Sequence, residues 1–138
     1  MIQLSNLTAQ VLTPGQSLTF NNIIHQSRCC KNECFNKQLP TSVKLTGGNY
    51  AIYKVEFHGN VSGTAGDILQ LYLGLAGQPM PETEMRVIPN GDPNSNNVSA
   101  GTYIILACED VDRVSVINGG TTNIAIAPNA TLLIRRVA

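Results

Sequence analysis

Residues 42–75 read SVKLTGGNYAIYKVEFHGNVSGTAGDILQLYLGL, and this stretch decides the fold. In YAIYKVEFHGNV, the side chains of Tyr53 and Phe57 fall on one side of an extended chain, whereas that of Lys54 falls on the other. In DILQLYLGL, leucine recurs at every second position. Alternation with a period of two indicates β-strands that bury one face, so both segments are predicted to lie in a sheet.

The same kind of pattern continues on either side of this stretch. Short alternating or apolar runs are separated by turns rich in Gly, Pro and Asn, and no run keeps a helical period beyond one turn. Ten strands are predicted, at residues 6–12, 17–25, 42–46, 50–61, 67–76, 84–88, 98–108, 113–118, 123–127 and 130–137. Many short strands without helices are typical of an antiparallel sandwich or barrel, and 138 residues suit a single domain.

One predicted strand, TYIILAC at 102–108, is apolar on both faces. A strand of a sandwich has only one core to face. We therefore expect its outer face to be covered by another subunit; the alternative is a central strand covered by a long loop.

The charge balance excludes two classes of partner. The chain has nine basic and nine acidic residues, whereas nucleic-acid and membrane-surface binding both depend on a basic surplus. No apolar run reaches the roughly 20 residues of a membrane span. The start, MIQLSNLTAQVL, lacks the features of a signal peptide, so we expect a product that stays in the host cell until lysis.

The order of motifs adds a resemblance to a known family. LTPGQSLTFNNI comes before the opening stretch, and VSAGTYIILACEDVDRVSVIN and NIAIAPNATLLIRRV follow it. This order resembles the compact jelly rolls of the tumour necrosis factor and complement globular-head type. It looks most like the short versions found in bacterial, spore-surface and bacteriophage proteins, and it covers nearly the whole chain after residue 7.

The resemblance implies a ten-stranded antiparallel jelly-roll sandwich that forms a tight homotrimer. It implies binding through surface loops or subunit seams, and neither catalysis nor a cofactor. In such trimers, apolar and aromatic residues of one sheet pack around the threefold axis. The corresponding candidates are Tyr50, Tyr72, Tyr103 and Ile105, for each of which an ordinary core position is the alternative.

The residue types that usually act in catalysis form no recognisable catalytic motif in this sequence. Neither His25 nor His58 lies in a metal-binding or catalytic pattern, and no nucleophile elbow or phosphate-binding loop occurs. Spacing singles out no pair among the carboxylates Glu56, Asp67, Glu109, Asp110 and Asp112. CEDVDR at 108–113 is a conceivable calcium site through Asp110 and Asp112, but a polar turn between strands is favoured. The chain is therefore not expected to be an enzyme.

The stretch HQSRCCKNEC at 25–34 holds Cys29, Cys30 and Cys34, and Cys108 lies far away in sequence. It is predicted to be a surface loop at about 26–41. A zinc site formed by the three cysteines and His25 has the right number of ligands but an unusual spacing. Disulfides that join Cys34 or Cys108 to one of the adjacent pair, or to another subunit, are favoured, and free thiols are the third reading.

These observations lead to a structural or interaction role. The leading hypothesis is a bacteriophage virion accessory protein: a capsid decoration, head fibre or tail-tip module. Such a protein would be made in the host cytoplasm and exposed after lysis, and would contact capsid proteins and, as a further candidate, a host-surface glycan. The alternative is a lectin-like module of a bacterial surface or spore coat.

Overall fold

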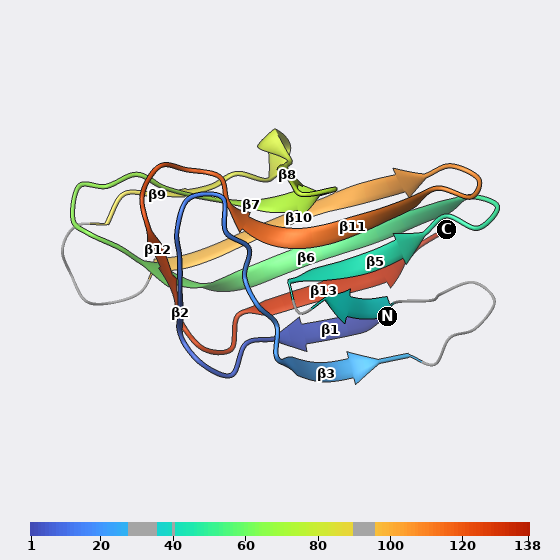
Figure 1. The fold of residues 1–138 in the computed structure, drawn as a ribbon, viewed down its shortest axis with the longest axis horizontal. Helices are drawn as coiled ribbons and strands as arrows, with labels where there is room; N and C mark the ends of the chain where they lie inside the picture. The colour runs from blue at the N-terminus through green and yellow to red at the C-terminus, as the bar shows by residue number, and fades with distance from the viewer. Residues whose placement is uncertain (28–35, 40, 90–95) are drawn as a thin grey trace.

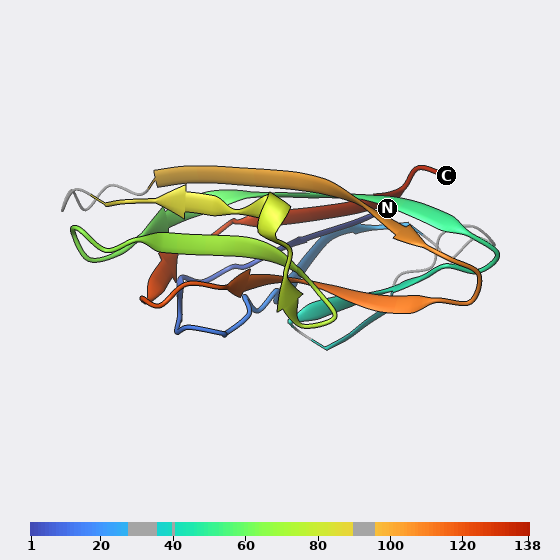
Figure 2. The ribbon, with the colours of Figure 1, turned by 90° about the horizontal axis from the view of Figure 1, so that it is seen from above.

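The computed structural model describes residues 1–27, 36–39, 41–89 and 96–138. These residues form two antiparallel β-sheets that lie face to face, as Figure 1 and the side view in Figure 2 show. The two ends of the chain lie at the same end of the molecule (Figure 1). Among the described residues, no helix is long and apolar enough to cross a membrane.

The first sheet has seven strands and is built around one long strand. Its members are β1 (Ile2–Ser5), β2 (Gln10–Leu12), β3 (Asn22–Gln26), β6 (Ala51–Ser62), β10 (Asn96–Leu106), β12 (Ile124–Ile126) and β13 (Thr131–Arg136). β10 pairs with β6 along the whole of its own length. β13 and β12 pair one after the other with the opposite edge of β6, and β1 and β3 continue the sheet beyond β13.

The second sheet has six strands. Its members are β4 (Asn36–Leu39), β5 (Ser42–Thr46), β7 (Leu69–Leu75), β8 (Gln78–Pro79), β9 (Met85–Val87) and β11 (Val111–Asn118). β11 lies at its centre between β5 and β7, and β8 and β9 both pair with β7. A short 3₁₀ helix, η1 (Pro81–Thr83), separates β8 from β9.

The alternation in the sequence explains how the sheets enclose a core. Tyr53, Val55 and Phe57 on β6 are buried, as predicted, and so are Leu69 and Leu71 on β7. They belong to a contiguous cluster of apolar side chains contributed by both sheets. Burial of such side chains contributes about 1.5–3 kcal/mol each, which makes this core the main source of stability.

Most of the predicted strands agree with the structure to within two residues at each end. The segment 42–46 is β5, and β6, β7 and β13 differ from prediction by one or two residues at each end. The prediction of one strand at 6–12 was wrong, because β1 lies at Ile2–Ser5 and β2 begins at Gln10. β1, β4 and β8 were not predicted, so the described residues form thirteen strands rather than ten.

The predicted strand 17–25 also differs from the structure, for a topological reason. Ser17 forms an isolated bridge with Ile117 of the second sheet, and the chain then crosses to the first sheet, where β3 begins at Asn22. Leu18 and Phe20 point into the core during this crossing. Alternating burial therefore extends through the crossing as far as Phe20 and ends before β3, none of whose residues is buried.

Candidate interaction surface

The outer face of the seven-stranded sheet carries the residues that the sequence analysis assigned to solvent or to a partner. Because side chains alternate along a strand, the neighbours of the buried Tyr53 and Val55 point outward. The register places Ile105 of β10 opposite Ile52 of β6, and Tyr103 opposite Lys54.

Apolar side chains gather at one end of this face, and we call them the outer patch: Tyr50, Ile52, Tyr103, Ile105 and Val137. Tyr103 is 60% exposed and Ile105 is 63% exposed, although both lie in a regular strand. The backbone N–H of Val137 donates to the carbonyl of Ile52 over 2.8 Å, which holds the end of the chain beside β6. The patch therefore lies on regular β-structure.

Contacts next to the outer patch are polar and fixed. Lys54 Nζ lies 3.0 Å from Glu56 Oε1 and 5.9 Å from the centroid of the Tyr103 ring. Arg136 Nη2 donates to the carbonyl of Tyr50 over 2.6 Å. Charged groups thus border an apolar centre, an arrangement common in protein–protein interfaces.

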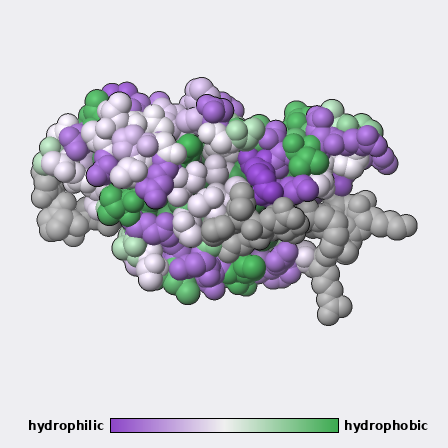
Figure 3. All heavy atoms as spheres, in the orientation of Figure 1, coloured by the Kyte–Doolittle hydropathy of each residue, from purple (hydrophilic) through white to green (hydrophobic). Residues whose placement is uncertain are grey.

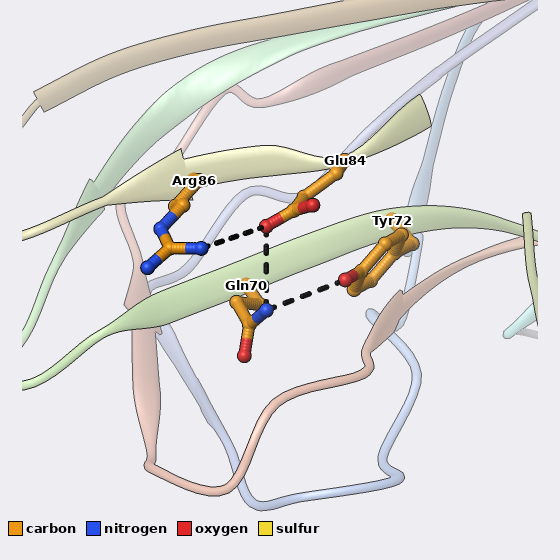
Figure 4. Close-up of polar contacts among 4 residues, drawn as sticks. All are labelled: Gln70, Tyr72, Glu84 and Arg86. Carbon is orange, nitrogen blue, oxygen red and sulfur yellow. Dashed lines mark hydrogen bonds and ion pairs between the residues drawn. The ribbon is translucent and has the colours of Figure 1, made fainter. Parts of the chain in front are cut away.

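The structure brings together three of the four predicted interface residues. Tyr50, Tyr103 and Ile105 lie at the same end of the seven-stranded sheet, whereas Tyr72 lies on β7 of the other sheet. Gln70 Nε2 donates to Tyr72 Oη over 3.5 Å and to Glu84 Oε1 over 3.3 Å (Figure 4). Glu84 Oε1 also lies 4.0 Å from Arg86 Nη1 (Figure 4). Tyr72 therefore belongs to a polar cluster within its own chain and is not grouped with the other three.

Ile52 and Val137 were missed as members of this surface. Ile52 was placed on the outer face of its strand but was not named as an interface residue. The signal was present in the sequence, because Ile52 lies two residues before Lys54 and therefore on the same face of the strand. Its position opposite Ile105 depends on strand register, which the sequence alone does not fix.

The predicted bond between the cysteine-rich loop and Cys108 is not supported. Cys108 is a free, exposed thiol in the turn between β10 and β11. Cys29, Cys30 and Cys34 lie outside the described residues. The predicted loop at about 26–41 is wrong in one respect, because Asn36–Leu39 forms β4 and pairs with β5.

The carboxylates of CEDVDR take part in local structure. Asp110 Oδ2 accepts a hydrogen bond from the backbone N–H of Ala107 over 3.3 Å, and Asp112 Oδ1 accepts one from Arg113 N over 3.2 Å. The backbone of Glu109 donates to Gly48 O over 2.7 Å, which joins this turn to the turn before β6. Among the described residues, no group of three or more His, Cys, Asp or Glu side chains is arranged to hold a metal ion.

Comparison with solved structures shows the fold. The chain is similar to the globular domain of zebrafish complement 1qA protein, with a TM-score of 0.60 and 16% identity over 96% of this chain and 94% of that one. A family 35 carbohydrate-binding module from Clostridium thermocellum aligns with a TM-score of 0.37 and 11% identity, over 95% of this chain and 97% of that one. No protein-family model and no curated protein matches the sequence. The jelly-roll fold of the complement globular-head type is thus confirmed.

Proposed function

We propose that the protein is a non-enzymatic binding module that assembles as a homotrimer through the outer patch. The observation that carries the proposal is the exposure of Tyr103 and Ile105, which lie in a regular strand of the seven-stranded sheet. Exposed apolar groups that adjoin one another are typical of interaction sites, because covering them releases water from apolar surface. A closed ring of identical subunits covers the patch on every copy.

The likeness to the complement globular domain supports a binding module, since it extends over nearly the whole of both chains. The distribution of polarity also supports the choice of face. Figure 3 looks onto the outer face of the six-stranded sheet, where hydrophilic and neutral residues predominate and the hydrophobic areas are separate. The outer patch lies on the opposite sheet.

The biological role that we propose is that of a bacteriophage virion accessory protein, in which the trimer is attached to the capsid or tail and contacts the host surface. A balanced charge suits this role, because a protein without a basic surplus does not attract the nucleic acid around it. In this role the protein is a structural part of the virion and acts by binding and not by catalysis.

Two measurements test the proposal. Native mass spectrometry of the wild-type protein at micromolar concentration should give a species of three times the chain mass of 14.8 kDa. Proteomics of particles purified from a lysate of the source cells should find the protein in a fixed ratio to the major capsid protein. A monomer in the first measurement would reject the assembly, and absence from washed particles would reject the virion role.

A further inference from the structure

A pocket of about 470 Å³ lies on the outer face of the six-stranded sheet, away from the outer patch. Its volume is within the range of roughly 300–1,000 Å³ usual for small-molecule sites. The lining comes from β11, from β5 and the residue before it, from the turn after β7 and from the segment at Ser17. The lining residues are Ser17, Thr41, Ser42, Ala76, Gly77, Val111, Asp112, Arg113 and Ser115.

The alternation of side chains determines which groups of β5 and β11 face this pocket. Val114 of β11 is paired with Val43 of β5, and both belong to the core. Residues next to them in the sequence point to the opposite face of the sheet. The outward-facing side chains are therefore those of Ser42, Lys44, Arg113 and Ser115.

The pocket is a hollow because β7 places no side chain beside Ser115. The partner of Ser115 on β7 is Gly74. A Cβ atom at Gly74 would lie 2.6 Å from Ser115 Oγ, so a larger residue would displace this hydroxyl. Ala76 and Gly77, which follow β7, also have small side chains or none. Small residues on neighbouring segments thus leave room above the sheet.

Two cationic side chains lie side by side here, one in the lining and one next to it. Arg113 is in register with Lys44 of the neighbouring strand. Arg113 Nη1 donates to Ser42 Oγ over 3.3 Å, which holds the guanidinium against the wall of the pocket. Lys44 forms no ion pair with any residue in the described ranges. Like charges directly opposite each other destabilise a sheet, so an anion bound beside them would relieve their repulsion.

The carboxylates near the pocket do not cancel this positive charge. Asp112 is in register with the buried Leu45, which places its side chain on the face of β11 opposite to that of Arg113. Glu109 and Asp110 lie in the turn before β11, where the Asp110 carboxylate accepts a hydrogen bond from the backbone of the same turn. The described side chains that face the pocket are therefore cationic, hydroxylic or apolar.

We propose that this pocket binds a phosphate group, either free or carried as a monoester. The Arg113 guanidinium offers paired N–H donors that match two phosphate oxygens, and Lys44 adds a second positive charge. Further donors are the hydroxyls of Ser17, Thr41, Ser42 and Ser115. A carboxylate has only two oxygens and would use fewer of these donors. The pocket also leaves room for an organic group, which would contact Ala76 and Val111.

The inference goes beyond the proposed function and does not depend on it, because the pocket and the outer patch lie on different sheets. It is also compatible with the balanced charge of the chain. A nucleic-acid surface needs a row of cations that follows many phosphates, whereas one phosphate group needs only the two that lie here.

The test is a nuclear magnetic resonance titration of the uniformly ¹⁵N-labelled full chain at neutral pH. The probes are inorganic phosphate and glycerol 1-phosphate, with acetate as the carboxylate comparison, and sodium chloride keeps the ionic strength constant so that screening does not change. We expect saturable shifts at the amides of β11, of Ser42 and of the turn after β7, with millimolar affinity. Tighter binding of glycerol 1-phosphate would assign the group to an ester, and tighter binding of inorganic phosphate to the free ion.

Three variants locate the binding. Arg113→Gln should weaken phosphate binding about tenfold, because both the charge and the paired donors are lost. Lys44→Gln should weaken it about threefold, because only a point charge is lost, and it tests the site even if Arg113→Gln does not fold. Arg86→Gln is the matched control: it removes a cation from β9 of the same sheet, where Arg86 lies beside Glu84, and should bind as the wild type does.

The inference is rejected if neither phosphate probe gives saturable shifts around Arg113 up to about 50 mM, well above the expected affinity. It is rejected equally if acetate binds as tightly as phosphate, if Lys44→Gln binds as the wild type does, or if Arg86→Gln weakens binding as much as Lys44→Gln. The proposed function fails independently: a trimer without phosphate binding rejects the pocket alone, and a phosphate-binding monomer rejects the assembly alone.

Discussion

The side-chain amide of Asn6 makes three hydrogen bonds inside the protein. Its Nδ2 donates to the carbonyls of Thr8 and Ala127 over 3.1 and 3.0 Å, and its Oδ1 accepts from Ala130 N over 2.8 Å. Asn6 is fully buried. One side chain therefore joins the segment after β1 to the turn before β13, which are more than 120 residues apart in the sequence.

Asn6→Asp tests this role with almost no change in shape. The carboxylate keeps the acceptor for Ala130 but loses both donors, and its second oxygen then faces two carbonyl oxygens. We expect a loss of about 3 kcal/mol or more in the free energy of unfolding at neutral pH, measured by urea denaturation.

Asn60→Asp is the matched control, because Asn60 is exposed on β6 and its side chain makes no hydrogen bond within the described residues. It should change the free energy of unfolding by less than about 0.5 kcal/mol. Equal stability of the two variants would show that the Asn6 amide does not hold the two segments together.

The sequence did not reveal the role of Asn6. Asn6-Leu7-Thr8 has the form of a glycosylation site, one of several in a chain rich in Asn, Ser and Thr. A polar residue beside a short strand normally indicates a solvent-exposed turn. Its three partners lie at residues 8, 127 and 130, and only the folded chain brings them together.

At the scale of elements, β6 was predicted well because its alternation is long and it buries one face. Tyr103 and Ile105 were named from the family resemblance, and the structure exposes both on β10. Alternation does not say which sheet a strand joins, because side-chain burial depends on the core and not on the hydrogen-bonding partner. Tyr72, which the resemblance grouped with them, lies on β7 of the other sheet.

Ile105→Lys tests whether β10 forms the subunit interface. An ammonium group in the middle of a buried apolar contact must lose water without gaining a partner, so the trimer should dissociate to monomers. Sedimentation velocity across a concentration series would report the change, and Tyr103→Lys should behave in the same way.

Ile88→Lys is the control for this experiment. Ile88 is 60% exposed, close to the 63% of Ile105, but it follows β9 and lies outside the outer patch. The substitution adds the same charge at a comparable exposure and should leave the trimer intact. If both lysine variants dissociate alike, added charge and not the outer patch controls assembly.

At the scale of the whole molecule, the two outer faces of the sandwich differ in character. The seven-stranded sheet carries an apolar patch, whereas the six-stranded sheet carries a hydroxyl-lined pocket. A trimer formed through the first face would leave the second open to solvent. The pocket could not be predicted from the sequence, because Ser17, Ser42 and Ser115 are short polar residues in separate segments that follow no common pattern.

The last prediction concerns what holds the molecule together. A bond between Cys108 and Cys34 would close a loop of about 75 residues and stabilise the fold by roughly 4 kcal/mol. In the structure Cys108 is free and exposed, and a contiguous apolar core connects the two sheets. Cys108→Ser, purified without reductant, should therefore melt within about 2 °C of the wild type, measured by scanning calorimetry. The melting temperature of the wild type treated with a reductant, compared with that of the untreated protein, reports any disulfide formed by the other cysteines. A fall of about 10 °C in Cys108→Ser would instead mean that sulfur fixes the cysteine-rich segment to the β10–β11 turn.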